Sequence, residues 1–211
     1  MSPAVALLAF IAAGCVLIVT PGPDTALVLR TAAVEGPRRG AYTSAGICFG
    51  LLWWGLAAAL GISALLAASH TAYTVLRAIG AAWLVWLGCN IFFRRPRRTP
   101  ADGGAPLFTD GTDAAWFWRG LLSNVTNPKV GVFFITFLPQ FVPADVAVAP
   151  WIALLVVIHV ALSVIWLGLL IVATRSVGRL LRRPAVSRTL DRITGAVLVG
   201  AGVRLAAEGG R

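Results

Sequence analysis

The sequence predicts an all-α integral membrane protein with six transmembrane helices. Of its 211 residues, 58% are hydrophobic and only 12% are charged, whereas soluble domains contain about 25% charged residues. Four long segments, residues 1–23, 40–76, 78–93 and 146–174, contain no Asp, Glu, Lys or Arg. Because about 20 apolar residues cross a bilayer as a helix, these segments supply four spans, and two weaker apolar segments complete the six.

The expected helices, in chain order, cover residues 4–20, 40–68, 72–93, 116–143, 148–174 and 189–207. The first lacks the basic start of a signal peptide, so we expect it to be retained. The segment 94–113 has the prolines, glycines and mixed charges of an exposed cytoplasmic loop. It divides one transmembrane domain, 1–211, into halves of about 1–93 and 114–211. Halves with an odd number of helices enter the membrane from opposite sides, which predicts two inverted three-helix repeats.

The basic residues lie in alternate loops of this topology. The chain carries a formal charge of +10, and the segments 30–39, 94–119 and 175–192 hold 14 of its 18 lysines and arginines. Cytoplasmic loops are enriched in these residues, so we expect both termini outside. Short basic loops separated by membrane helices cannot form one continuous basic face, which argues against a nucleic-acid partner. The expected macromolecular surroundings are the lipid bilayer.

The first and fourth predicted helices are both interrupted by proline beside an ionisable residue. The first carries "TPGPD" at 20–24 and the fourth carries "TNPKV" at 126–130. Proline costs about 3 kcal/mol inside a helix, and in a membrane such a break persists only where protein or a water-filled cavity satisfies the freed backbone. The exposed carbonyls, amides and helix-dipole ends are suitable ligands for a zwitterion such as an amino acid.

The charged residue of each break suggests a binding hypothesis. If both breaks face one cavity, Asp24 could attract a substrate ammonium or carry a coupling proton, and Lys129 could attract a carboxylate. In the alternative interpretation, the first helix simply ends at the cytoplasmic surface. Asp24 then caps an amphipathic segment, 24–34, and Lys129 extends to the membrane interface.

Four further features bear on function. His159 lies mid-span in the fifth predicted helix, as a candidate proton relay or as a hydrogen-bonded core histidine. Gly46 and Gly50 form a GxxxG pattern that favours close helix packing. Two separated histidines and no clustered carboxylates predict neither an enzyme, nor a metal site, nor a cofactor. The sequence also contains no phosphate-binding loop, which argues against a primary pump.

Several stretches together resemble the lysine exporter (LysE/RhtB) family. They include "TPGPDTALVLR", "LRAIGAAWLVWLGCNIFFRR", "NPKVGVFFITFLPQFV" and "LDRITGAVLVGAGVRL", in that order along nearly the whole chain. The resemblance implies a small six-helix exporter of amino acids or related metabolites in the bacterial inner membrane, driven by the proton motive force. The residues that match the family's two motifs are Pro21, Gly22, Pro23, Asp24, Asn127, Pro128 and Lys129, with Pro139 and Gln140 closing the second.

The sequence leaves open one function of another class. A metal-ion exporter or channel of similar architecture would show competition by metals, or downhill flux without proton coupling. The identity of the amino acid, the coupling stoichiometry and association into a homo-oligomer are also left open by the sequence.

Overall fold

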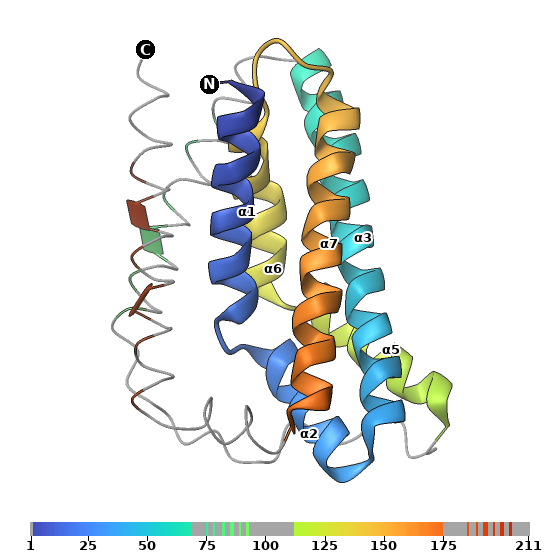
Figure 1. Ribbon diagram of the computed structural model, residues 1–211. Coiled ribbons are helices and arrows are strands. Elements are labelled where there is room, and N and C mark those ends of the chain that lie inside the picture. Colours follow the sequence, from blue (N-terminus) through green and yellow to red (C-terminus); the bar gives the residue numbers. More distant parts are fainter. Residues whose placement is uncertain are drawn as a thin grey trace.

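The computed structural model describes residues 2–68 and 112–174, together with single positions within 75–92 and 185–203. The predicted helices 72–93 and 189–207, and nearly all of the predicted loop 94–113, therefore fall outside the described residues. Every regular element in the described ranges is helical (Figure 1). The prediction of an all-helical protein is confirmed for these ranges.

The first broken element consists of α1 (Pro3–Val19) and α2 (Pro23–Val34), whose axes differ by 53°. The helix ends because Pro21 cannot donate to the hydrogen-bond ladder of α1 and holds the preceding Thr20 in an extended conformation (ψ 122°). The segment expected to be largely a loop between the first two spans is thus mostly the helix α2. It buries Thr25, Val28 and Thr31, and the chain then turns at Gly36, whose φ of 96° favours glycine.

The second broken element is more irregular than the single helix predicted over 116–143. It begins with α5 (Asp113–Val125) and resumes after a break as α6 (Pro128–Val132). A π-helical segment, η1 (Phe133–Phe137), and a 3₁₀ turn, η2 (Leu138–Phe141), follow directly. The bend at the break is again 53°. Both predicted interruptions are therefore real bends in the chain.

Two long helices complete the described structure. They are α3 (Pro37–Ala68) and α7 (Val148–Val172). Within the described residues, two helices are long and apolar enough to cross a membrane, and the number rises to four if each bent pair forms one span. This agrees with an integral membrane protein, with two to four candidate spans in the described residues.

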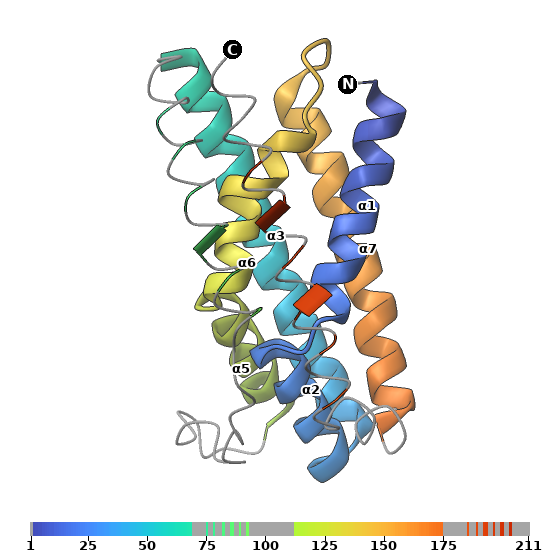
Figure 2. The same ribbon diagram turned by 90° about the vertical axis from the view of Figure 1, so that its left-hand side faces the viewer.

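The two broken elements run in opposite directions (Figures 1 and 2). Figure 1 shows α1 descending from the N-terminus to α2 at the lower end, whereas α5 starts at that lower end and leads up to α6. Accordingly α2 packs against α5, and α1 packs against η2. The two breaks lie next to each other where the two broken elements cross.

The most extensive packing in the described structure is between α3 and α5, and it depends on glycine. A Cβ built on Gly46 would lie 1.9 Å from the carbonyl oxygen of Phe117, and one built on Gly120 would lie 2.0 Å from the carbonyl oxygen of Thr43. No side chain fits at either position without separating the helices. The predicted glycine pattern therefore serves close packing, with Gly120 as the partner on α5.

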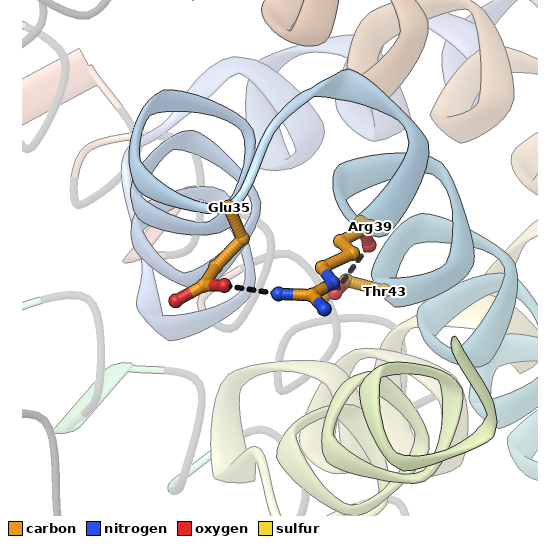
Figure 3. A network of polar contacts seen from close by, with 3 residues as sticks. All are labelled: Glu35, Arg39 and Thr43. Carbon is orange, nitrogen blue, oxygen red and sulfur yellow. Dashed lines mark hydrogen bonds and ion pairs between the residues drawn. The ribbon is translucent and has the colours of Figure 1, made fainter. Parts of the chain in front are cut away.

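At the lower end of the bundle in Figure 1, where α2 leads into α3, polar contacts link the helices. Figure 3 shows Glu35, which ends α2, paired with Arg39 in the first turns of α3. The Thr43 hydroxyl donates to the carbonyl oxygen of Arg39 at 3.0 Å, and Arg38 forms an ion pair of 2.8 Å with Asp113 at the start of α5. These contacts join α2, α3 and α5 at the end that carries the arginines.

Candidate functional site

The two breaks share one cavity with a volume of about 60 Å³. This volume holds a few water molecules and is well below the ~150 Å³ of a cavity known to admit benzene. The cavity is thus smaller than an amino acid. Its walls come from α1, α2, α3, α6, α7 and the end of α5, and its lining residues are Leu17, Ile18, Gly22, Asp24, Thr25, Ile47, Leu51, Asn124, Asn127, Lys129, Val130, His159, Ser163, Trp166 and Leu167.

Asp24, from the first break, is held by polar side chains of the second. The Ser123 hydroxyl donates to its Oδ1 at 2.7 Å, and the Asn124 amide donates to its Oδ2 at 2.9 Å. The Asn127 amide donates to the same Oδ2 at 3.2 Å. All three contacts are with hydrogen-bond donors, the set that an ionised carboxylate accepts.

Lys129, from the second break, is held by backbone of the first. Its Nζ donates to the carbonyl oxygen of Leu17 at 2.7 Å and to that of Thr20 at 3.0 Å. The last carbonyls of a helix have no partner within the helix and form the negative end of its dipole. A cation is the natural partner for the end of α1, so the Lys129 ammonium replaces the hydrogen bonds that the break removes.

The two breaks are therefore satisfied reciprocally. The acid of the first lies among donors of the second, and the base of the second lies on acceptors of the first. Asp24 and Lys129 are both partly buried, and a charge withdrawn from water is costly unless it is hydrogen-bonded, a requirement that this exchange meets for both. It also means that a change at one break disturbs the other.

Asn127 links the two breaks by serving both. Its amide nitrogen donates to Asp24, while its Oδ1 accepts from the backbone N–H of Lys129 at 3.1 Å. The second contact makes Asn127 the N-cap of α6, with Pro128 at the first helical position. The sequence "NP" thus starts α6 and positions the ammonium that follows it.

The remaining residues of the predicted site take different places. Gly22 lines the cavity and is also the N-cap of α2, so the interpretation of Asp24 as that cap is wrong. The Lys129 ammonium lies against the carbonyl oxygens of Leu17 and Thr20 at the end of α1. Pro21 and Pro23 flank the cap and shape the break without lining the cavity, and Gln140 lies in η2, also outside the lining residues.

His159 is buried, with 2% of its surface exposed, and its ring packs against three phenylalanines while bordering the cavity. Its Nδ1 has no hydrogen-bond partner among the described residues. The interpretation as a hydrogen-bonded core histidine is therefore wrong for this nitrogen.

Sequence reasoning missed several residues that build the site. Ser123 and Asn124 supply two of the three contacts to Asp24, and Asn124 is fully buried. The available signal was a run of polar residues, "SNVTN" at 123–127, inside an otherwise apolar helix, because polar side chains within a span face the protein interior. Nothing in the pattern identified the carbonyls of Leu17 and Thr20 as partners of Lys129.

Comparisons with known proteins agree with this architecture. Residues 15–209 match a family model described as LysE type translocator. An uncharacterized membrane protein of Bacillus subtilis is 29% identical over 203 residues, which cover 94% of this chain and 97% of the relative. A leucine efflux protein of Klebsiella pneumoniae is 28% identical over 202 residues, with coverage of 94% and 93%.

A third relative, an uncharacterized membrane protein of Pseudomonas aeruginosa, is 33% identical over 196 residues, with coverage of 90% and 89%. No solved structure matches the chain. The family match extends over nearly the whole sequence and includes both helix breaks, so the resemblance found in the motifs is confirmed: the chain belongs to the family of LysE type translocators.

Proposed function

We propose that this protein is a secondary transporter that exports an amino acid from the cytoplasm and is driven by the proton motive force. Membership of a translocator family supports transport. Relatives that cover most of the chain include a leucine efflux protein, which supports an amino-acid cargo. The substrate binds at the two helix breaks, between the halves of the molecule.

The reciprocal contact between Asp24 and Lys129 and the opposite breaks carries this proposal. An amino acid presents an ammonium and a carboxylate, the same two charged groups that the protein itself places in the cavity. A substrate ammonium can replace the amide donors at Asp24, and a substrate carboxylate can replace the α1 carbonyls at Lys129. Binding then exchanges one set of polar contacts at Asp24 and Lys129 for another. The charged groups of the substrate thus gain hydrogen bonds that replace those they lose to water.

The rest of the cavity favours an apolar side chain on the substrate. Most of the other lining residues are hydrophobic, including Leu17, Ile47, Leu51, Val130 and Leu167. Burial of apolar surface stabilises a complex by roughly 25 cal/mol per Å². Because the cavity holds only a few waters, its walls must move apart to admit the substrate.

The topology extends the same proposal. The broken elements cross in opposite directions with equal bends of 53°, which supports two inverted repeats with one break in each. Arg30, Arg38, Arg39 and Arg119 belong to the helices at the end opposite the N-terminus (Figure 1). The positive-inside rule then places that end in the cytoplasm and the N-terminus outside the bacterial inner membrane.

A metal-ion exporter or channel of similar architecture is the competing function. Within the described residues, no three His, Cys, Asp or Glu side chains come together. The transport assay separates the two functions directly, because excess Zn²⁺ or Mn²⁺ would compete with a metal cargo but not with an amino acid.

The test is efflux of labelled amino acids from proteoliposomes with an imposed pH gradient. We expect saturable efflux of apolar amino acids such as leucine, accelerated by the gradient and reduced in Asp24→Asn and Lys129→Ala. Asp24 and Lys129 are partly buried, and a hydrogen bond to a charged group contributes about 1.5–3 kcal/mol, so each variant should lose at least about 10-fold in efflux rate at 1.4 kcal/mol per factor of ten.

The matched control is Gly168→Ala, because a Cβ at this position of α7 meets no atom within 4 Å and the residue does not line the cavity. It should transport like the native protein. If folded native protein moves no amino acid, the proposed cargo is wrong.

A further inference from the structure

His159 lies at the boundary between the cavity and an aromatic cluster. On one side its ring borders the cavity that contains Asp24 and Lys129. On the other, ring centroids of Phe10, Phe133 and Phe134 lie at 6.1, 5.1 and 5.4 Å from the imidazole. The helix α1, which carries Phe10, leads from the cavity to the end of the bundle where the N-terminus lies (Figure 2). The cluster therefore lies on the N-terminal side of the cavity.

The unpartnered Nδ1 of His159 lies at the contact between α1 and α7. A Cβ built on Gly14 of α1 would lie 3.2 Å from this nitrogen. A buried polar atom without a partner is destabilising, because it has lost its hydrogen bonds to water, and Nδ1 has none among the described residues. Separation of α1 from α7 would expose Nδ1 to water and remove this cost. With α1 packed on α7, Nδ1 therefore lacks a hydrogen bond that it can form with water once the two helices separate.

The charged groups that share the cavity with His159 are Asp24 and Lys129. The described residues that touch its ring from α1 and η1 are uncharged phenylalanines and a glycine. Asp24 is already held by three donors of the second break. An imidazolium here would lose its hydration beside the Lys129 cation, which is strongly unfavourable. While α1 is packed on α7, the imidazole of His159 is therefore neutral.

We propose that His159 is the proton-transfer residue that couples export to the proton gradient. This rests on the proposed function. When α1 separates from α7, Nδ1 takes a proton from water on the outer side and the ring becomes cationic. When α1 packs on α7 again and the cavity faces the cytoplasm, the ring gives one proton to water in the cavity and returns to the neutral form. On the outer side an O–H bond of hydronium breaks as the N–H bond forms, and in the cavity the N–H bond breaks as an O–H bond to water forms, so one proton moves inward in each cycle.

The experiment measures leucine efflux from proteoliposomes with and without a pH gradient, together with internal pH reported by an entrapped dye. The native protein should be faster with the gradient, and the internal pH should change in step with efflux. In His159→Gln, which keeps a polar side chain of similar reach but binds no proton, we expect the ratio of the two rates to fall to one. The dye response should vanish as well.

Gly168→Ala serves as the folded control and should keep both the ratio and the dye response. His159→Phe, which extends the aromatic cluster, replaces the glutamine variant if that variant does not fold. A native-like ratio in either variant would overturn the proposal. A folded variant that moves no leucine under either condition would also overturn it, because His159 would then act in substrate binding. Absence of leucine flux in the native protein would instead reject the proposed function.

Discussion

The two helix breaks look alike in sequence, yet they are built in opposite ways. The first exposes the carbonyl end of α1 and carries an acid, whereas the second starts a new helix with an asparagine cap and carries a base. The acid meets only side-chain donors, and the base meets two backbone carbonyls. Each charge is therefore fitted to a particular kind of partner on the other break, which a simple exchange of acid and base would not preserve.

The helices that lead into the breaks are also held differently. The helix α5, before the second break, approaches α3 so closely that Cβ atoms at Gly46 or Gly120 would overlap backbone oxygens. The helix α1, before the first break, meets α7 through side chains, with Gly14 against the imidazole of His159. Backbone contacts of the kind between α3 and α5 leave no room for rotation or sliding. We therefore expect that α1 moves during transport while α5 stays with α3.

The largest expected effect comes from exchanging the two charges. In the double variant Asp24→Lys with Lys129→Asp, an ammonium would face the three donors around position 24. A carboxylate would face the carbonyls of Leu17 and Thr20. The carboxylate and the carbonyl oxygens repel each other, and carbonyls cannot donate hydrogen bonds, so we expect leucine efflux to stay at least about 10-fold below the native rate, as in either single variant.

The measurement is initial efflux from proteoliposomes containing equal amounts of folded protein. If the two charges acted only on each other, the exchange would restore transport, as it does for an isolated ion pair. Recovery to near the native rate would therefore mean that neither the donors around Asp24 nor the carbonyls at Lys129 matter for transport.

The next-largest expected effect is a loss of stability when the close contact between α3 and α5 is disturbed. Gly46→Ala and Gly120→Ala each force α3 and α5 apart, because the added carbon would overlap a carbonyl oxygen at 1.9 or 2.0 Å. Overpacking typically costs about 1–3 kcal/mol, and we expect values near the upper end. Thermal unfolding in detergent measures the loss. Gly61→Ala, on the same α3 helix with no atom within 4 Å of the new carbon, should be close to native. Equal melting temperatures for all three would show that α5 is not fixed to α3.

Much of this fold could be predicted, because its signals are local. Apolar length and breaking prolines predicted helices within a few residues of α1 and α7, and "TPGPD" and "TNPKV" both mark true bends. The predicted helix 116–143 was wrong in its interior. The π-helical segment over Phe133–Phe137 has no distinct sequence signature, since its apolar run fits an α-helix equally well.

The site was less predictable for a physical reason. Asp24 and Lys129 could be singled out because charge in a membrane span is costly. Their partners lie about a hundred residues away in the chain, and backbone carbonyls carry no side-chain identity to recognise. The Nδ1 of His159 likewise lacks a partner only because of how α1 packs on α7, and a single sequence does not encode such a pairing in its pattern.

The smallest expected effect is on the free energy of unfolding when the N-caps of the two breaks, Gly22 and Asn127, are replaced by alanine. Gly22 caps α2 in an extended conformation (φ −147°, ψ −174°) that other residues can adopt. A Cβ there would lie 3.7 Å from the Lys129 Nζ, an ordinary contact. Gly22→Ala should therefore change the free energy of unfolding by less than about 0.5 kcal/mol. Asn127→Ala, which removes both the cap of α6 and a donor to Asp24, should cost about 1 kcal/mol or more. Chemical denaturation in detergent resolves the two values. A larger loss for Gly22→Ala would mean that the first break needs glycine for the motion of α1, because the structure itself leaves room for the methyl group.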